Sequence, residues 1–84
     1  MLRATLPLMP TQDNPSAKSA LARKLKRLRR ASGMSQQELA EAANVGRALI
    51  IEIESGDSNP TLDNLERIAR ALKTDIVGLF SPVA

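Results

Sequence analysis

The stretch SQQELAEAANVGRALIIEIESG, residues 35–56, decides the fold of this chain. Its first residues form a capping box, because the Ser35 hydroxyl can accept from the Glu38 amide while the Glu38 carboxylate accepts from the Ser35 amide. The pattern therefore predicts a helix that begins at Gln36. This helix carries small and aliphatic residues at helical spacing, at Leu39, Ala40 and Ala43.

The helix that begins at Gln36 runs into the triplet Asn44, Val45 and Gly46. Asn and Gly tolerate the left-handed backbone that a sharp turn requires, and Val45 is expected to fill the corner. A second helix should cover residues 47–55, with Gly56 just past its C-terminus, where glycine is most favoured. The stretch thus predicts two short helices on either side of a tight turn.

This layout resembles the helix-turn-helix of the Cro and phage-repressor family, and the resemblance extends from about Leu25 to Phe80. The residues that carry it are Gln36, Leu39, Ala40, Val45, Ile50, Ile53, Glu54, Gly56, Asn59, Pro60 and the closing pattern LERIARALKTDIVGLF at 65–80. The resemblance implies an all-α, compact five-helix domain like that of lambda repressor, with a central helix-turn-helix at 36–55, that binds DNA.

Composition limits the alternatives. Eighty-four residues allow one domain with a thin core. The absence of Cys and His removes disulfides, thiol chemistry, zinc-finger ligation and the commonest general base. We therefore expect no catalytic residues, no metal and no cofactor. No apolar run approaches the length of a membrane span, and prolines interrupt any signal peptide, although a cleaved organelle-targeting peptide stays open.

Charge is distributed unevenly along the chain. Residues 1–37 carry eight Lys or Arg against one Asp, a net charge of +7, and residues 38–84 carry four against eight acidic residues, a net charge of −4. Such asymmetry favours one face that attracts polyanions. The seven cations between residues 18 and 30 are interpreted either as a solvated face or as a surface that attracts phosphates.

The N-terminal residues 1–13 lack a usable period and contain two prolines, which indicates a mobile arm. Arg3 in this arm is either part of a disordered tail or a contact to a DNA groove. The domain is predicted at 14–84, with Asn14 as cap and Pro15 as first residue of a helix that ends near Ala31. Its buried stripe is expected at Leu21, Leu25 and Leu28.

The resemblance also assigns roles to residues of the first two helices. Arg29 is implied to form a structural ion pair with Glu54, which would tie the first helix to the third. Gln36 and Gln37 are implied to contact the DNA backbone, because a helix N-terminus with a long amide side chain suits phosphate. Gln36 could also be no more than a solvent-facing helix former.

A helical wheel at about 100° per residue places Ile50 and Ile53 on the inward side of the helix 47–55. The residues on its outward side are Arg47, Ala48, Ile51 and Glu52. In a helix-turn-helix this outward face enters the major groove. Arg47 could pair with guanine or hold a phosphate, Ala48 and Ile51 could touch thymine methyls, and Glu52 could accept from cytosine or act against wrong bases. Leu49, which flanks the buried side, completes the candidate DNA contacts on this helix.

The remaining segment contains a loop and two helices. Ser58 and Asn59 in the loop are expected to reach phosphate, as the matching loop does in the family. Thr61 should cap a helix whose inner stripe includes Leu62, and Thr74 should cap the last helix. The last helix should close the core and form the dimer interface with its apolar residues, which are Ile76, Val77, Leu79 and Phe80.

The predicted function is sequence-specific binding of double-stranded DNA as a homodimeric transcriptional regulator in the cytoplasm, associated with the nucleoid. Two features depart from the family pattern: Ile51 is a large aliphatic residue on a face that is usually polar, and Glu52 brings a negative charge close to phosphates. The alternative is therefore a protein-interaction adaptor or antitoxin-like module on the same fold. It would bind a protein partner through Leu49, Ile51 and the last helix.

Overall fold

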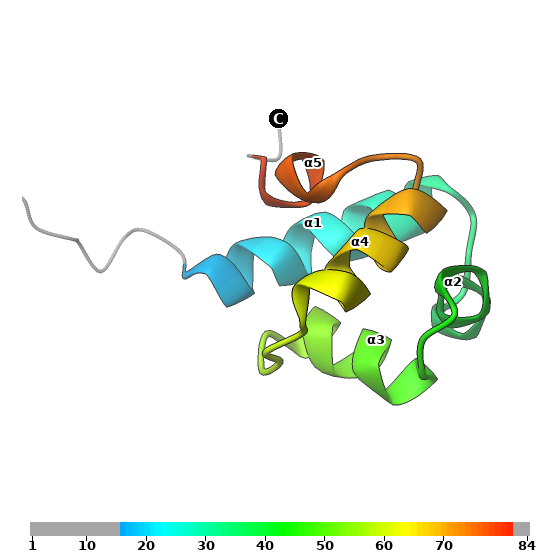
Figure 1. Cartoon of the computed structure of the whole chain (residues 1–84), viewed down its shortest axis with the longest axis horizontal. Helices are drawn as coiled ribbons and strands as arrows, with labels where there is room; N and C mark the ends of the chain where they lie inside the picture. The colour runs from blue at the N-terminus through cyan, green and yellow to red at the C-terminus, as the bar shows by residue number, and fades with distance from the viewer. Residues whose placement is uncertain (1–15, 82–84) are drawn as a thin grey trace, which may run out of the picture.

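The computed structural model describes residues 16–81, and within this range the chain forms five helices and no strand (Figure 1). The helices are α1 (Ala17–Ala31), α2 (Gln36–Ala43), α3 (Arg47–Ser55), α4 (Leu62–Ala71) and α5 (Ile76–Phe80). The all-α, five-helix prediction is confirmed. The predicted arm at 1–13 lies outside the described residues.

Helix α1 begins two residues later than predicted. Ser16, rather than Asn14, is its N-cap, since Ser16 has an extended backbone and its hydroxyl accepts from the Ser19 amide at 3.1 Å. A serine cap is as favourable as an asparagine cap, so the pattern at Asn14 and Pro15 did not decide the start. The helix ends at Ala31, as predicted.

The capping box of α2 is present. Ser35 Oγ accepts from the Glu38 amide at 3.0 Å, and Glu38 Oε1 accepts from the Ser35 amide at 2.8 Å. Asn44 ends the helix in the left-handed region with φ 58°. Gly46 differs from the prediction, because its φ of −73° is ordinary extended backbone. The turn therefore needs left-handed geometry at Asn44 only.

Helix α3 ends at Gly56, whose φ of 86° makes glycine the favoured residue there. Thr61 caps α4 by accepting from the Asn64 amide at 3.1 Å. The cap of α5 is Asp75, which accepts from the Gly78 amide at 2.8 Å, and not Thr74. Asp and Thr are both favourable caps, so the sequence alone left this start ambiguous by one residue.

The core lies where all five helices meet. Helix α1 packs against α3 and α5, while α2 packs against α3 and α4, and α4 also contacts α5. Six large side chains are completely buried, namely Leu25, Leu39, Ile50, Ile53, Ile68 and Leu79. Leu62, expected on the inner stripe of α4, is 70% exposed. As the first residue of α4 it lies at the edge of the buried stripe formed by Leu65, Ile68 and Ala69.

Candidate nucleic-acid interface

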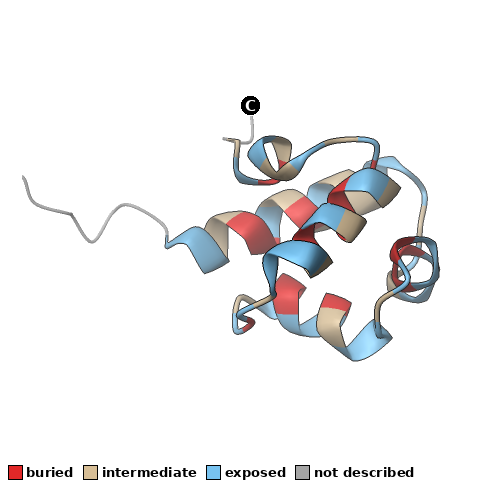
Figure 2. Ribbon diagram, in the orientation of Figure 1, coloured by how far each residue is buried: buried red, intermediate tan, exposed pale blue. Residues whose placement is uncertain are grey.

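Helix α3 has one buried and one open face (Figure 2). Ile50 and Ile53 are at most 1% exposed, and Glu54 is 8% exposed. The opposite face is open to solvent and consists of Arg47, Ala48, Ile51 and Glu52. These four residues, hereafter the outward face of α3, include the cation and the aliphatic side chain that the sequence singled out.

Leu49 does not belong to the outward face. It is half-buried and packs against the core cluster, so only part of its side chain is open to a partner. On the helical wheel Leu49 is about 100° from the completely buried Ile50, so it lies at the border of the buried face. A contact by Leu49 to DNA or to a protein would therefore be made from the edge of the face.

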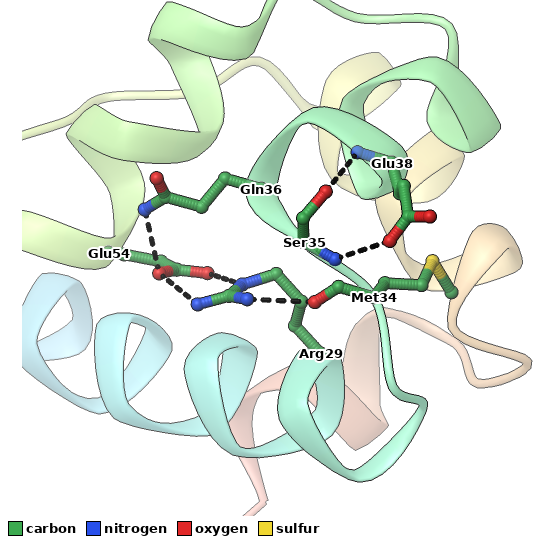
Figure 3. Close-up of polar contacts among 6 residues, drawn as sticks. All are labelled: Arg29, Met34, Ser35, Gln36, Glu38 and Glu54. Atoms are coloured by element: carbon green, nitrogen blue, oxygen red, sulfur yellow. Dashed lines mark hydrogen bonds and ion pairs between the residues drawn. The ribbon is translucent and has the colours of Figure 1, made fainter.

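An ion pair anchors the C-terminal half of α3 to α1 (Figure 3). Arg29 Nε lies 2.6 Å from Glu54 Oε2 and Nη2 lies 3.1 Å from Oε1, a two-point arrangement that fits the planar guanidinium. Arg29 Nη1 also donates to the Met34 carbonyl at 2.8 Å. The pair thereby connects α1, the segment before α2, and α3.

The ion pair is mostly withdrawn from water, with 12% of the Arg29 side chain and 4% of the Glu54 side chain exposed. Burial by itself would raise the pKa of Glu54. The hydrogen bonds from Arg29 and Gln36 and the charge of Arg29 outweigh this effect, so the pKa of Glu54 lies below its usual value. The hydrogen bond with Glu54 raises the pKa of Arg29, so both groups are charged near neutral pH.

Gln36 has a role that the sequence did not reveal. Its Nε2 donates to Glu54 Oε1 at 3.1 Å, so Glu54 accepts from both α1 and α2 (Figure 3). An amide has a second N–H, so this bond leaves one donor for another partner. Gln37 is exposed, and its Nε2 donates to Glu41 Oε2 at 2.9 Å within α2. No local spacing signals a bond between Gln36 and Glu54, because eighteen positions separate them.

Arg67 forms a second side-chain contact between elements that are distant in the sequence. Its Nε lies 3.2 Å from Asp63 Oδ2, one turn earlier on the same helix. Arg67 Nη1 also donates to the Asn44 carbonyl at 3.3 Å, which links α4 to the turn between α2 and α3.

The loop before α4 presents only one of its two predicted contacts. Asn59 is exposed, whereas Ser58 is 8% exposed. The expectation that the Ser58 side chain reaches phosphate is therefore not favoured, because little of that side chain is open to solvent. Ser58 and Leu21 border the same small hollow, so this loop lies near the first half of α1.

The last helix divides its apolar residues between the core and the surface. Leu79 is completely buried, so its prediction as a dimer contact is wrong, since the domain needs it to fill the core between α1, α4 and α5. Ile76 is half-buried and packs against the same core. Val77 and Phe80 are 75% and 38% exposed and are the two that remain open to a partner.

The described residues 16–81 contain no cluster of three or more acidic side chains with metal-ligand spacing. Within the same range, no helix has both the length and the apolar character needed to cross a membrane.

Comparison with known proteins identifies the family. Residues 25–79 match the family model described as helix-turn-helix. The chain is 39% identical over 62 residues to the HTH-type transcriptional regulator SutR of Escherichia coli K12, covering 74% of this chain and 35% of SutR. It is 46% identical over 41 residues to the control protein C.BamHI of Bacillus amyloliquefaciens, covering 49% of this chain and 51% of that protein. The chain thus spans about half or less of these two relatives.

Solved structures agree with this match. The restriction-modification controller protein C.AhdI from Aeromonas hydrophila superposes with a TM-score of 0.72 at 32% identity, covering 75% of this chain and 96% of that one. A hypothetical transcription factor, NHTF from Neisseria, gives 0.76 at 30% identity, covering 93% and 88%. The names of these relatives describe regulators and control proteins rather than enzymes. The chain belongs to the helix-turn-helix family.

Proposed function

We propose that the protein is a transcriptional regulator that binds double-stranded DNA in a sequence-specific manner, with α3 in the major groove. The observation that carries this proposal is the two-sided character of α3, whose Ile50 and Ile53 are buried while the outward face is open. A helix that is fixed on one side and exposed on the other can enter a groove without losing its packing. The transcriptional regulator SutR, the control protein C.BamHI and the immunity repressor of Bacillus phage phi105 support the same function.

The residues of the outward face suit contacts with base edges. Arg47 is the first residue of α3 and is exposed, so it can reach guanine O6 and N7 or a phosphate. Ala48 and Ile51 offer apolar surface for thymine methyl groups, and Glu52 can accept from cytosine N4. Gln36 and Gln37 at the start of α2, and Asn59 in the loop before α4, are proposed to contact the sugar-phosphate backbone on either side.

We propose that the regulator acts as a two-fold dimer. Val77 and Phe80 of α5 supply exposed apolar surface, and half-buried Ile76 lies on the same helix. A two-fold dimer would present two copies of α3 to half-sites about one helical turn apart. Because its target is DNA, we expect the protein in the cytoplasm, at the nucleoid.

One observation favours a second function on the same fold. Ile51 is a large aliphatic residue that is 41% exposed, and Glu52 beside it is exposed and acidic. An apolar residue on an exposed face suits a protein partner, and an acidic one opposes phosphate. The competing proposal is an adaptor that binds another protein through Ile51, Leu49 and the last helix.

Selection from a pool of randomised duplexes, followed by sequencing, tests the choice between these functions. The regulator proposal expects enrichment of a palindrome, and fluorescence anisotropy on that duplex should show affinity falling steeply with salt. Arg47→Ala should weaken binding to the selected duplex by about tenfold or more, as expected for loss of a bidentate base contact.

Arg70→Gln serves as the matched control, since Arg70 is an exposed cation on α4 that lies beside α5 and the end of α2. It should leave the affinity for the selected duplex close to that of the wild type. No enrichment by a folded, helical protein would exclude the regulator and favour the adaptor. Enrichment that is insensitive to Arg47→Ala would contradict the assigned role of Arg47.

A further inference from the structure

Four cations of α1 form one continuous row, which we call the cationic stripe: Arg23, Lys26, Arg27 and Arg30. Their spacing of three, four and seven residues places them on a single face of the helix. Arg23, Arg27 and Arg30 are exposed, and Lys26 is half-buried at the side nearest α3. The stripe cations lie outside the core cluster and do not belong to the ion pair between Arg29 and Glu54.

No cation of the stripe forms an ion pair in the part of the chain that the structure describes, although the charge of Lys26 helps to lower the pKa of Glu54. Between residues 16 and 81, carboxylates lie within 4.0 Å of Arg29 and Arg67 only. Helix α1 itself contains no acidic residue. Like charges three and four residues apart repel one another along a helix face. A polyanion laid across the stripe would relieve this repulsion.

The stripe adjoins the outward face of α3. One surface hollow is lined by all four cations of the stripe together with Ala22 and Glu54. A second hollow shares Lys26, Arg30 and Glu54 with the first and extends to Gln36, Ile51 and Ser55. Helix α1 also packs directly on α3 (Figure 1). The two hollows therefore connect the stripe to Ile51 on the outward face and to Gln36 at the start of α2.

From this placement we infer that the cationic stripe is a second backbone-binding surface, which holds phosphates of the same duplex whose major groove receives α3. The inference rests on the proposed function and adds to it a set of contacts outside the helix-turn-helix. Seven residues of helix span roughly 10 Å, at about 1.5 Å per residue. A stripe of this length can reach more than one phosphate of one strand, since the strand carries one charge per about 3.4 Å of duplex axis. The strand concerned is the one beside Gln36, because the second hollow ends there.

The salt dependence of binding tests the inference. Lys26→Gln/Arg30→Gln removes the two cations that both hollows share, while glutamine keeps the helix propensity. The slope of log K against log salt should become shallower by about 1 to 2, since each lost phosphate contact removes about 0.9. The selected duplex and a random duplex should lose affinity by the same factor, because phosphate contacts do not depend on sequence.

The matched control is Arg70→Gln/Lys73→Gln, which also removes two positive charges. Arg70 lies on α4, and Lys73 lies in the segment between α4 and α5. The hollows beside Arg70 are formed by residues of α2, α4 and α5 and share no residue with those of the stripe. The control variant should keep the wild-type slope. Circular dichroism and thermal unfolding of both variants should confirm that each is folded.

Phosphate-ethylation interference locates the contacts. Ethylation of a short run of phosphates on one strand of each half-site should weaken the wild type more than it weakens Lys26→Gln/Arg30→Gln. Equal slopes for the wild type and the stripe variant would overturn the inference while leaving the proposed function intact. An equal change in both double variants would also overturn it, because net charge rather than position would be responsible. A wild type that binds no duplex would overturn the proposed function together with the inference.

Discussion

The two helices of the motif are similar in length but are held in different ways. Helix α2 is fixed at its start by its own neighbours, through the two hydrogen bonds between Ser35 and Glu38. Helix α3 has no side-chain cap at Gly46, and its C-terminal half is held by Arg29, a residue 25 positions away in the chain. Hydrogen bonds between near neighbours in the sequence therefore fix the start of α2. A tertiary contact holds α3, the helix that is proposed to read DNA.

The largest effect is expected from breaking the tertiary contact. Glu54→Ala should lower the free energy of unfolding by about 3 kcal/mol, because it leaves Arg29 without its partner at a site where only 12% of the Arg29 side chain is exposed. Urea unfolding monitored by circular dichroism would measure the loss. The double variant Arg29→Met/Glu54→Leu should recover much of it, since no unpaired charge remains. A loss below about 0.5 kcal/mol in Glu54→Ala would show that α3 is not held by this pair.

The same pair predicts a pH dependence. The folded-state pKa of Glu54 lies below its usual value of 4.5, so the folded state binds this proton more weakly than the unfolded state does. The contribution of Glu54 to stability is therefore complete above about pH 4.5 and is lost as the pH falls through the lower folded pKa.

Urea midpoints of the wild type and of Glu54→Gln, measured from pH 7 down to strongly acidic pH, would test this dependence. The advantage of the wild type should be constant near neutrality and shrink in the acid range. All other carboxylates are common to both proteins and should largely cancel. An advantage that grows as the pH falls would contradict the sign of the pKa shift.

A smaller effect is expected at the start of α2. Ser35→Ala removes the acceptor for the Glu38 amide and should lower the free energy of unfolding by about 1 kcal/mol. Ser16→Ala at the exposed start of α1 is the matched comparison. It removes a cap with a single hydrogen bond, to the Ser19 amide, and should cost less. Because alanine at position 35 keeps the amide that donates to Glu38, equal losses would indicate that this reciprocal bond does not strengthen the Ser35 cap.

The smallest effect, and the only gain, is expected at the start of α3. Gly46 has a φ of −73°, and a Cβ added there would meet no atom within 4 Å. Gly46→Ser should therefore supply the missing cap and raise the free energy of unfolding by a few tenths of a kcal/mol. Chemical unfolding would measure the gain, with Gly56→Ser as control. That variant should destabilise, because Gly56 has a φ of 86°.

The contrast between the two helices also explains what the sequence predicted. The capping box, the left-handed Asn44 and the C-terminal Gly56 follow from residue types within one or two turns of each other, and all three are present. The buried face of α3 follows from its period. The ion pair of Arg29 with Glu54 came from the resemblance to a family, since no local pattern connects residues 25 positions apart.

The features that the sequence did not predict correctly also share a cause. Leu79 and Val77 are both apolar residues of a five-residue helix, too short for its period to separate buried from exposed positions. Packing against α1 and α4 buries Leu79 completely and leaves Val77 75% exposed. Ser58 is buried by the path of its loop, and the bond from Gln36 to Glu54 depends on how α2 meets α3. Each of these requires the assembled helices.

The most direct test of the central claim is a map of backbone amide chemical shifts by NMR, recorded while the selected duplex is added to the labelled protein. We expect the largest changes at the outward face of α3, at Arg47, Ala48, Ile51 and Glu52, with further changes at the start of α2. Leu25 and Ile68, completely buried in α1 and α4, should change little. Large changes elsewhere with an unperturbed α3 would contradict the claim that this helix reads DNA.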